Sequence, residues 1–227
     1  MATHYDTVHL TGVASTQDES ADRFDRSGTP TLVVADRQFA GRGRQGRTWE
    51  QADRAMFASY SYATSWPAAT RPLIPLVTGV AMREAIMGLT DASVLLKWPN
   101  DLIVDGRKLG GILVEASGER ITVGCGVNLW WRDLPAAAAA LYDMDPGPSA
   151  AWALADTWVS RLVGDLANGP DEWRRGEYIS ASATIGRRIA WGAGEGLATD
   201  LAPDGGLVVA TDEGTVTIHA GEVHTRQ

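Results

Sequence analysis

Short apolar runs separated by turn residues dominate the first 130 residues of the chain, and they predict β-strands. The dipeptide Asp105-Gly106 lies between two such runs and is a strong signal for a two-residue hairpin, and Gly118-Glu119 marks a second turn. Strands are predicted at residues 8–13, 31–35, 56–62, 94–98, 102–104, 109–115 and 121–127.

Helices are predicted where apolar residues recur at a spacing of three and four. The first begins at Thr16, because Thr16 and Glu19 have the spacing of a capping box, and it runs to about Arg26. The second is expected to end near Gly88. The other helices are predicted at residues 71–89, at 149–166 after the break at 145–148, and through Trp173 and Tyr178.

The pattern changes after Ala183, where short apolar runs alternate with glycine turns. This texture predicts a small β-barrel with strands at residues 187–191, 196–201, 206–211 and 214–219. We therefore expect two domains, at residues 1–182 and 183–227.

Composition restricts the class of protein. With 227 residues and 44% hydrophobic content the chain can bury a full core, and its single cysteine, Cys125, lies in a predicted strand, where packing is its expected role. No apolar run approaches the roughly 20 residues of a membrane span, and the N-terminus lacks the layout of a signal peptide, so we expect a cytoplasmic protein without membrane contact. The net charge of −8 argues against general nucleic-acid binding.

Two short stretches nevertheless concentrate positive charge. Residues 41–47 contain three arginines and three glycines, so the backbone can approach a ligand while guanidinium groups bind phosphate or carboxylate oxygens bidentately. Residues 97–101 lead into 106–111, a predicted hairpin that supplies a further lysine. Such a site suits a reaction between two anions, for example a carboxylate and ATP, which otherwise repel each other.

Other interpretations of these motifs remain open. Gly41, Gly43 and Gly46 satisfy the dinucleotide-binding spacing G-x-G-x-x-G, but no helical pattern begins at Gly46. Residues 41–47 can also be a solvated surface loop, and Lys108 an ordinary exposed lysine. No Walker motif, serine-hydrolase motif or metal-binding spacing of His and Cys is present, so we predict no metal site built from protein ligands alone.

With these motifs in view, the chain resembles the biotin protein ligases. The resemblance is carried nearly end to end by residues 15–17, 41–49, 97–101, 106–115 and 124–128. It implies an α+β fold, in which a central mixed β-sheet flanked by helices forms a biotin/lipoate ligase-like catalytic domain, followed by a small C-terminal SH3-like β-barrel.

The resemblance also implies the reaction and its residues. Biotin and ATP, with Mg²⁺, would form biotinyl-5′-AMP, and the biotin would then pass to a lysine of a biotin carboxyl carrier domain. The implied catalytic residues are Lys108, Arg44 and Asp101. The implied biotin-binding residues are Ser15, Thr16, Gln17, Gln38, Arg42, Gly43, Arg44, Lys108 and Gly111. The residues implied for ATP or the adenylate are Arg42, Arg44, Arg47, Trp49, Asn100, Asp101 and Asn128.

Two departures from the family pattern matter. Gln17 stands where the family more often has Asn, a shorter amide with the same donors and acceptors. The catalytic signature starts by residue 15, so we expect no winged helix-turn-helix and no DNA binding. Lipoate or octanoate ligases and a non-enzymatic anion- or RNA-binding module are the competing functions, and the assembly is expected to be a monomer or a homodimer.

Overall fold

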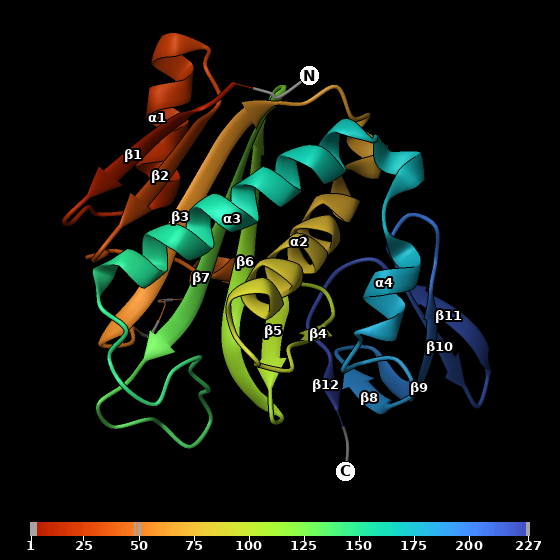
Figure 1. Cartoon of the computed structure of the whole chain (residues 1–227). Helices are drawn as coiled ribbons and strands as arrows, with labels where there is room; N and C mark the ends of the chain where they lie inside the picture. Colours follow the sequence, from red (N-terminus) through yellow and green to blue (C-terminus); the bar gives the residue numbers. More distant parts are fainter. Residues whose placement is uncertain (1–3, 48, 50, 226–227) are drawn as a thin grey trace.

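The computed structural model describes residues 4–47, 49 and 51–225, which form two β-sheets with helices packed on the larger one (Figure 1). The larger sheet has the strand order β1-β2-β3-β7-β6-β5-β4, and only the β1–β2 pair is parallel. Helix α1, Thr16–Ser27, connects these two parallel strands. The strands are β1 Asp6–Leu10, β2 Thr31–Ala35, β3 Arg54–Ala63, β4 Leu95–Lys97, β5 Asp101–Val104, β6 Arg107–Ser117 and β7 Arg120–Trp130.

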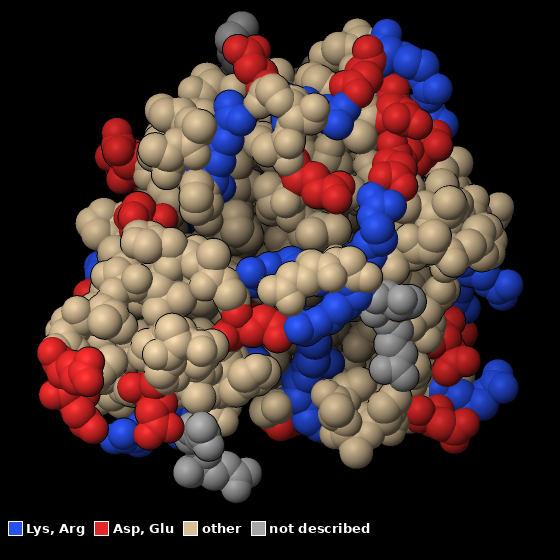
Figure 2. All heavy atoms as spheres, turned by 180° about the vertical axis from the view of Figure 1, so that it is seen from behind, with Lys and Arg blue, Asp and Glu red and all other residues tan. Residues whose placement is uncertain are grey.

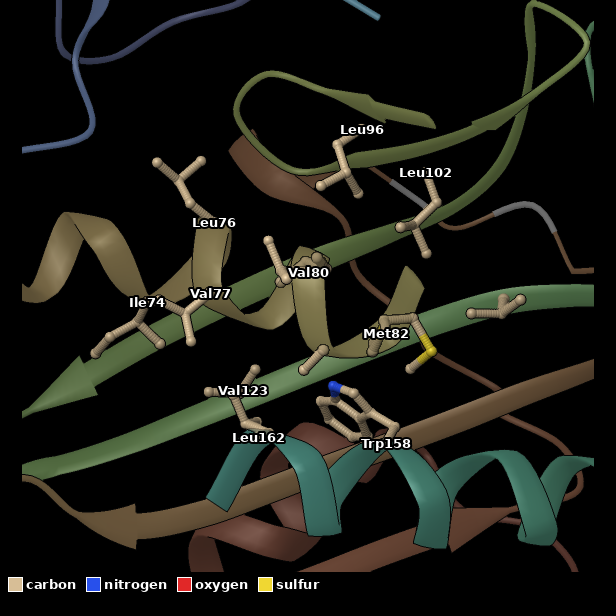
Figure 3. Packing of buried hydrophobic residues seen from close by; sticks show 14 of the residues in the cluster. Ile74, Leu76, Val77, Val80, Met82, Leu96, Leu102, Val123, Trp158 and Leu162 are labelled. Carbon is tan, nitrogen blue, oxygen red and sulfur yellow. The ribbon is translucent and has the colours of Figure 1, made fainter. Parts of the chain in front are cut away.

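Alternation along β3 and β7 gives the sheet two unlike faces, because successive residues of a strand point to opposite sides. One face carries buried apolar side chains such as Val123 of β7 and packs against α2, Ile74–Leu89, and α3, Pro148–Ala167. Trp158 and Leu162 of α3 approach this face in Figure 3. The opposite face carries Ser, Thr and Gly, and α1 covers only part of it. The uncovered part is where a ligand can bind.

Helix α2 is preceded by the 3₁₀ helix η2, Ala68–Leu73. The combined segment Ala68–Leu89 spans 22 residues and contains an 18-residue stretch with a mean hydropathy of 1.3, which is long and apolar enough to cross a membrane by length and composition. The expectation that no apolar run approaches that length is therefore wrong. Of this apolar stretch, 61% is buried, and the helix packs against α3 and β6, as expected of a core helix.

The smaller, antiparallel sheet has the order β11-β10-β9-β8-β12. It is joined to the larger sheet by a connection containing η3, Pro170–Glu172, and α4, Arg175–Ser180. Leu96 of β4 bonds to the backbone of Ala181 and Ala183, so the two parts meet across the predicted boundary at residues 182–183, which stays a prediction. The strands are β8 Arg188–Trp191, β9 Gly194–Leu201, β10 Leu207–Thr211, β11 Gly214–Ile218 and β12 His224–Thr225.

The fold class is confirmed: a mixed sheet is flanked by helices and followed by a second antiparallel sheet. One local prediction is wrong. The first helix begins at Thr16 as predicted, but the capping box of Thr16 and Glu19 does not form, because Ser15 is the N-cap and the Thr16 hydroxyl contacts Gln38 and Ser59 instead. Helix α2 ends at Leu89, one residue after Gly88, and this end agrees with the prediction.

Candidate functional site

A cavity of about 340 Å³ opens on the polar face of the larger sheet, beside the N-terminus of α1. Its floor is made by glycines of β6 and β7, because a side chain there would meet other groups lining the cavity. A Cβ atom built on Gly126 would lie 2.9 Å from the ring of Trp49, and one on Gly111 would lie 3.0 Å from the same ring. The glycines thus allow the indole of Trp49 to lie against the sheet.

Positive charges from three separate segments converge at one end of this cavity. Lys108 Nζ on β6 lies 2.7 Å from Asp101 Oδ1 on β5, and Arg44 donates to Asn100 Oδ1 at 2.8 Å. Figure 2 shows Lys, Arg, Asp and Glu side chains around a hollow on the face turned away from the viewer in Figure 1. The hairpin that carries Lys108 has Asp105 and Gly106 at its turn, with φ of 51° and 74°.

The backbone around Lys108 is held by the alanine-rich segment that follows β7. Lys108 N donates to Ala137 O at 3.2 Å, and Ala139 N donates to Lys108 O at 2.8 Å. Asn128 Nδ2 donates to Ala139 O at 3.1 Å, so Asn128 supports this segment from the other side. The low-complexity alanines therefore form a short bridge that positions the lysine.

Two loop arginines are paired with acids at the rim of the cavity. Arg42 donates to both carboxylate oxygens of Asp18, at 2.8 and 2.6 Å, and this pairing holds the pKa of Asp18 below its ordinary value. Arg47 pairs with Glu222 and lowers the pKa of that carboxyl group in the same way. Arg44 also donates to Gly221 O at 3.3 Å, so residues 221–224 close one wall of the cavity.

The other end of the cavity is polar but uncharged. Thr16 N donates to Gln38 Oε1 at 2.7 Å, and the Thr16 hydroxyl lies 2.8 Å from the hydroxyl of Ser59 on β3. Ser59 in turn lies 3.1 Å from Gln17 Oε1. These hydroxyls and amides can hydrogen-bond a neutral polar group, whereas the opposite end suits an anion.

The structure brings together all but one of the residues predicted from the sequence. Asn128 does not line the cavity, since its side chain faces the alanine segment. Sequence reasoning missed Ser59, Gly124 and residues 222–224 as cavity residues. The residues that were predicted from the sequence and do line the cavity are Ser15, Thr16, Gln17, Gln38, Arg42, Gly43, Arg44, Arg47, Trp49, Asn100, Asp101, Lys108 and Gly111.

Metal-binding and nucleophilic groups are sparse in this site. Within residues 4–47, 49 and 51–225 no group of three or more His, Cys, Asp and Glu side chains could hold an ion. Cys125 lies under the floor and is buried, and desolvation raises the pKa of its thiol well above the ordinary value. The thiol is therefore protonated at neutral pH, in agreement with a packing role.

This fold and cavity define an α+β protein with a binding site for an anionic substrate that also has a neutral polar part. The chain belongs to the biotin/lipoate A/B protein ligase family, whose model matches residues 10–129. A second model, the biotin protein ligase C-terminal domain, matches residues 184–226.

Individual relatives agree with this assignment. The chain is 28% identical to the biotin–[acetyl-CoA-carboxylase] ligase of Mycobacterium tuberculosis over 93% of its length and 86% of that protein. It is 35% identical to the bifunctional ligase/repressor BirA of Escherichia coli, over 53% of this chain and 39% of that one. The structure of Aquifex aeolicus biotin protein ligase with biotin and ATP superposes with a TM-score of 0.81, at 28% identity, covering 99% of this chain and 100% of that one.

Proposed function

We propose that this chain is an ATP-dependent biotin protein ligase. In the first step a carboxylate oxygen of biotin attacks the α-phosphorus of ATP, a P–O bond forms, and the bond to pyrophosphate breaks. In the second step the ε-amine of an acceptor lysine attacks the acyl carbon of biotinyl-5′-AMP, an amide forms, and AMP leaves with the electron pair of the broken C–O bond. Neither step requires a covalent bond to the enzyme.

The observation that carries this proposal is the division of one cavity into a charged and an uncharged end. Two anions about 4 Å apart repel each other by roughly 1 kcal/mol in water and about 4 kcal/mol at a protein surface. Five basic side chains line the cavity as a whole, and those of Lys108 and Arg44 lie beside Asp101 and Asn100 at its charged end, where their positive charge offsets that repulsion. The basic residues are Arg42, Arg44, Arg47, Lys97 and Lys108.

The cavity residues fit Mg²⁺ only as a companion of the nucleotide. Mg²⁺ keeps several waters and takes one or two carboxylates together with substrate phosphates, and the cavity offers Asp101 beside Lys108 and Glu222 beside Arg47. When bound, the ion would supply charge neutralisation at the phosphates. Lys108 and Arg44 perform the same task from fixed positions in the protein, where they also orient the reacting carboxylate.

The acceptor in our proposal is a lysine on a biotin carboxyl carrier domain of an acyl-CoA carboxylase. That lysine must reach the acyl carbon, so the carrier has to dock where the cavity is open. We propose that the reaction takes place in the cytoplasm, where ATP is available. We propose no DNA-binding role. We propose that the protein is a monomer or a homodimer, and either assembly is compatible with a cavity whose lining residues come from one chain.

The decisive experiment incubates the full chain with α-labelled ATP and Mg²⁺, with biotin, with lipoate or with neither. We expect a labelled adenylate only with biotin, and loss of at least 90% of it in Arg44→Ala. An adenylate formed with lipoate but not biotin would assign the chain to the lipoate-type activity instead. If neither acid supports adenylation and the chain retains labelled single-stranded RNA, the binding-module interpretation replaces the enzyme.

A further inference from the structure

Gln17 lies at the uncharged end of the cavity, yet its amide is already occupied by the protein. Gln17 Nε2 donates to Thr122 O at 3.1 Å and to Leu113 O at 3.4 Å, both on strands under the cavity. Its oxygen accepts from the Ser59 hydroxyl. The residue is 5% exposed, and both the nitrogen and the oxygen of its amide have protein partners.

The number of available protons restricts how the hydroxyl groups of Thr16 and Ser59, next to Gln17, can be oriented. Thr16 and Ser59 have one hydroxyl proton each, but they make three close contacts, to Gln38, to each other and to Gln17. Gln38 Oε1 already receives the backbone N–H of Thr16. Ser59 donates to Gln17 Oε1, and the Thr16 hydroxyl donates to Gln38 Oε1 or to Ser59 Oγ, so both hydroxyl protons are directed to protein acceptors. If Ser59 donated to Thr16 instead, Gln17 Oε1 would be buried without a donor, which is unfavourable.

Gly124 on β7 is what admits the long amide to this position. A Cβ atom built on Gly124 would lie less than 3.0 Å from Gln17 Oε1, a separation that real Cβ atoms essentially never show. Because Gly124 has no unusual φ, alanine at this position is opposed by the neighbouring side chain and not by the backbone, and the end of Gln17 would have to move to admit a methyl group. Gln17 and Gly124 are therefore complementary in size.

We propose that Gln17 is a positioning residue and not a ligand contact. Admitted by Gly124, it anchors a chain of hydrogen bonds through Ser59 to Thr16, so that both hydroxyls present only acceptor lone pairs to the cavity. The inference rests on the proposed function, in which these acceptors receive the ring N–H groups of a cyclic urea, the head of biotin. The Gln38 amide nitrogen is then the donor left for the urea carbonyl.

The test compares Gly124→Ala, Gln17→Asn and the double variant in the full chain. Gly124→Ala displaces the amide and frees the hydroxyls to rotate, so KM for biotin should rise about tenfold while KM for ATP changes less than about twofold. Asn at position 17 is one methylene shorter and leaves space for the new methyl. The double variant should therefore bind biotin better than Gly124→Ala alone, which an independent pair of sites would not produce.

Thermal unfolding of the ligand-free protein gives a second measurement. Gly124→Ala should lower Tm by roughly 5 °C and Gln17→Asn should restore part of that loss, because the overlap is relieved. Gly164→Ala is the matched control, since a Cβ atom on this glycine of α3 has nothing within 4 Å, and it should leave both KM values unchanged.

Additive effects of the two substitutions on KM and Tm would overturn the proposal, as would a Gly124→Ala variant with wild-type KM for biotin. Failure of the proposed function is distinguishable. If wild-type protein neither binds biotin nor forms an adenylate, the assignment of the substrate fails, and with it the positioning role toward a cyclic urea. The rescue of Tm then still decides whether Gln17 and Gly124 are a complementary pair.

Discussion

Replacing Lys108 by methionine removes one charge from the reacting end of the cavity while keeping a side chain of similar length. Lys108 is 46% exposed and pairs with Asp101 at 2.7 Å. An exposed pair of this kind contributes about 0–1 kcal/mol to folding. For a chain of this size that corresponds to a Tm decrease of no more than about 4 °C. The variant should therefore fold.

The effect on adenylation should be far larger than the effect on folding. The α-phosphate gains charge toward the transition state, and the Lys108 ammonium lies where the carboxylate and the phosphate meet in our proposal. Removing one preorganised group that stabilises such charge typically lowers the rate by 10²–10³, or about 2.7–4 kcal/mol. We expect Lys108→Met to lower kcat/KM for adenylation by about 100-fold or more.

Single-turnover formation of labelled adenylate from α-labelled ATP measures this rate without a carrier protein. Arg107→Met is the matched control, because Arg107 is the preceding residue of β6 and does not line the cavity. A loss of less than about threefold in Lys108→Met, or an equal loss in Arg107→Met, would refute the role assigned to Lys108.

Three further outcomes are expected. Trypsin should cleave after the arginines of residues 41–47 more slowly when biotin and ATP are both present, because bound anions order a charged glycine-rich loop; equal cleavage rates contradict this. Trp158→Ala should lower the free energy of urea unfolding by about 3–5 kcal/mol, since Trp158 is fully buried, whereas Trp158→Phe should cost clearly less. Arg54 and the N–H of Gly147 lower the pKa of Asp145 to about 2, so this carboxylate stabilises the fold above about pH 4 and loses that effect as the pH falls toward 2. Asp145→Asn should weaken the decline of Tm between pH 4 and 2, and an unchanged pH profile would count against the pairing.

Local sequence patterns predicted the secondary structure well where the residues strongly favour one backbone conformation. The run at residues 31–35 is all apolar or β-branched, and β2 spans those residues. Asp105-Gly106 adopts the positive φ angles that its sequence indicates. The capping-box pattern was misleading at Thr16, because its hydroxyl contacts Ser59 beside the cavity and does not cap the helix. Strand β12 was not predicted, because it has only two residues and forms by pairing with β8, which is distant in the sequence.

The candidate site could be predicted only in part, because a motif reports its own residues and not those that fold against it. Lys108, Arg44 and Asp101 were found from charge, glycine content and a family resemblance. Ser59 was missed because a serine in a strand has no distinguishing signal until its neighbours are known. Glu222 was missed because its partner Arg47 is 175 residues away in the sequence.

The closure of one wall by residues 221–224 also bears on how the protein can be divided. The two basic motifs, at residues 41–47 and 97–111, and all strands of the larger sheet precede residue 131, and a fragment chosen on motifs alone would keep them. Such a fragment would lack the carbonyl of Gly221 that holds Arg44 and the carboxylate that holds Arg47. Arg47 would then lose its carboxylate partner and Arg44 one of its two acceptors, so engineered fusions or split versions of the enzyme should preserve the segment that carries Gly221 and Glu222.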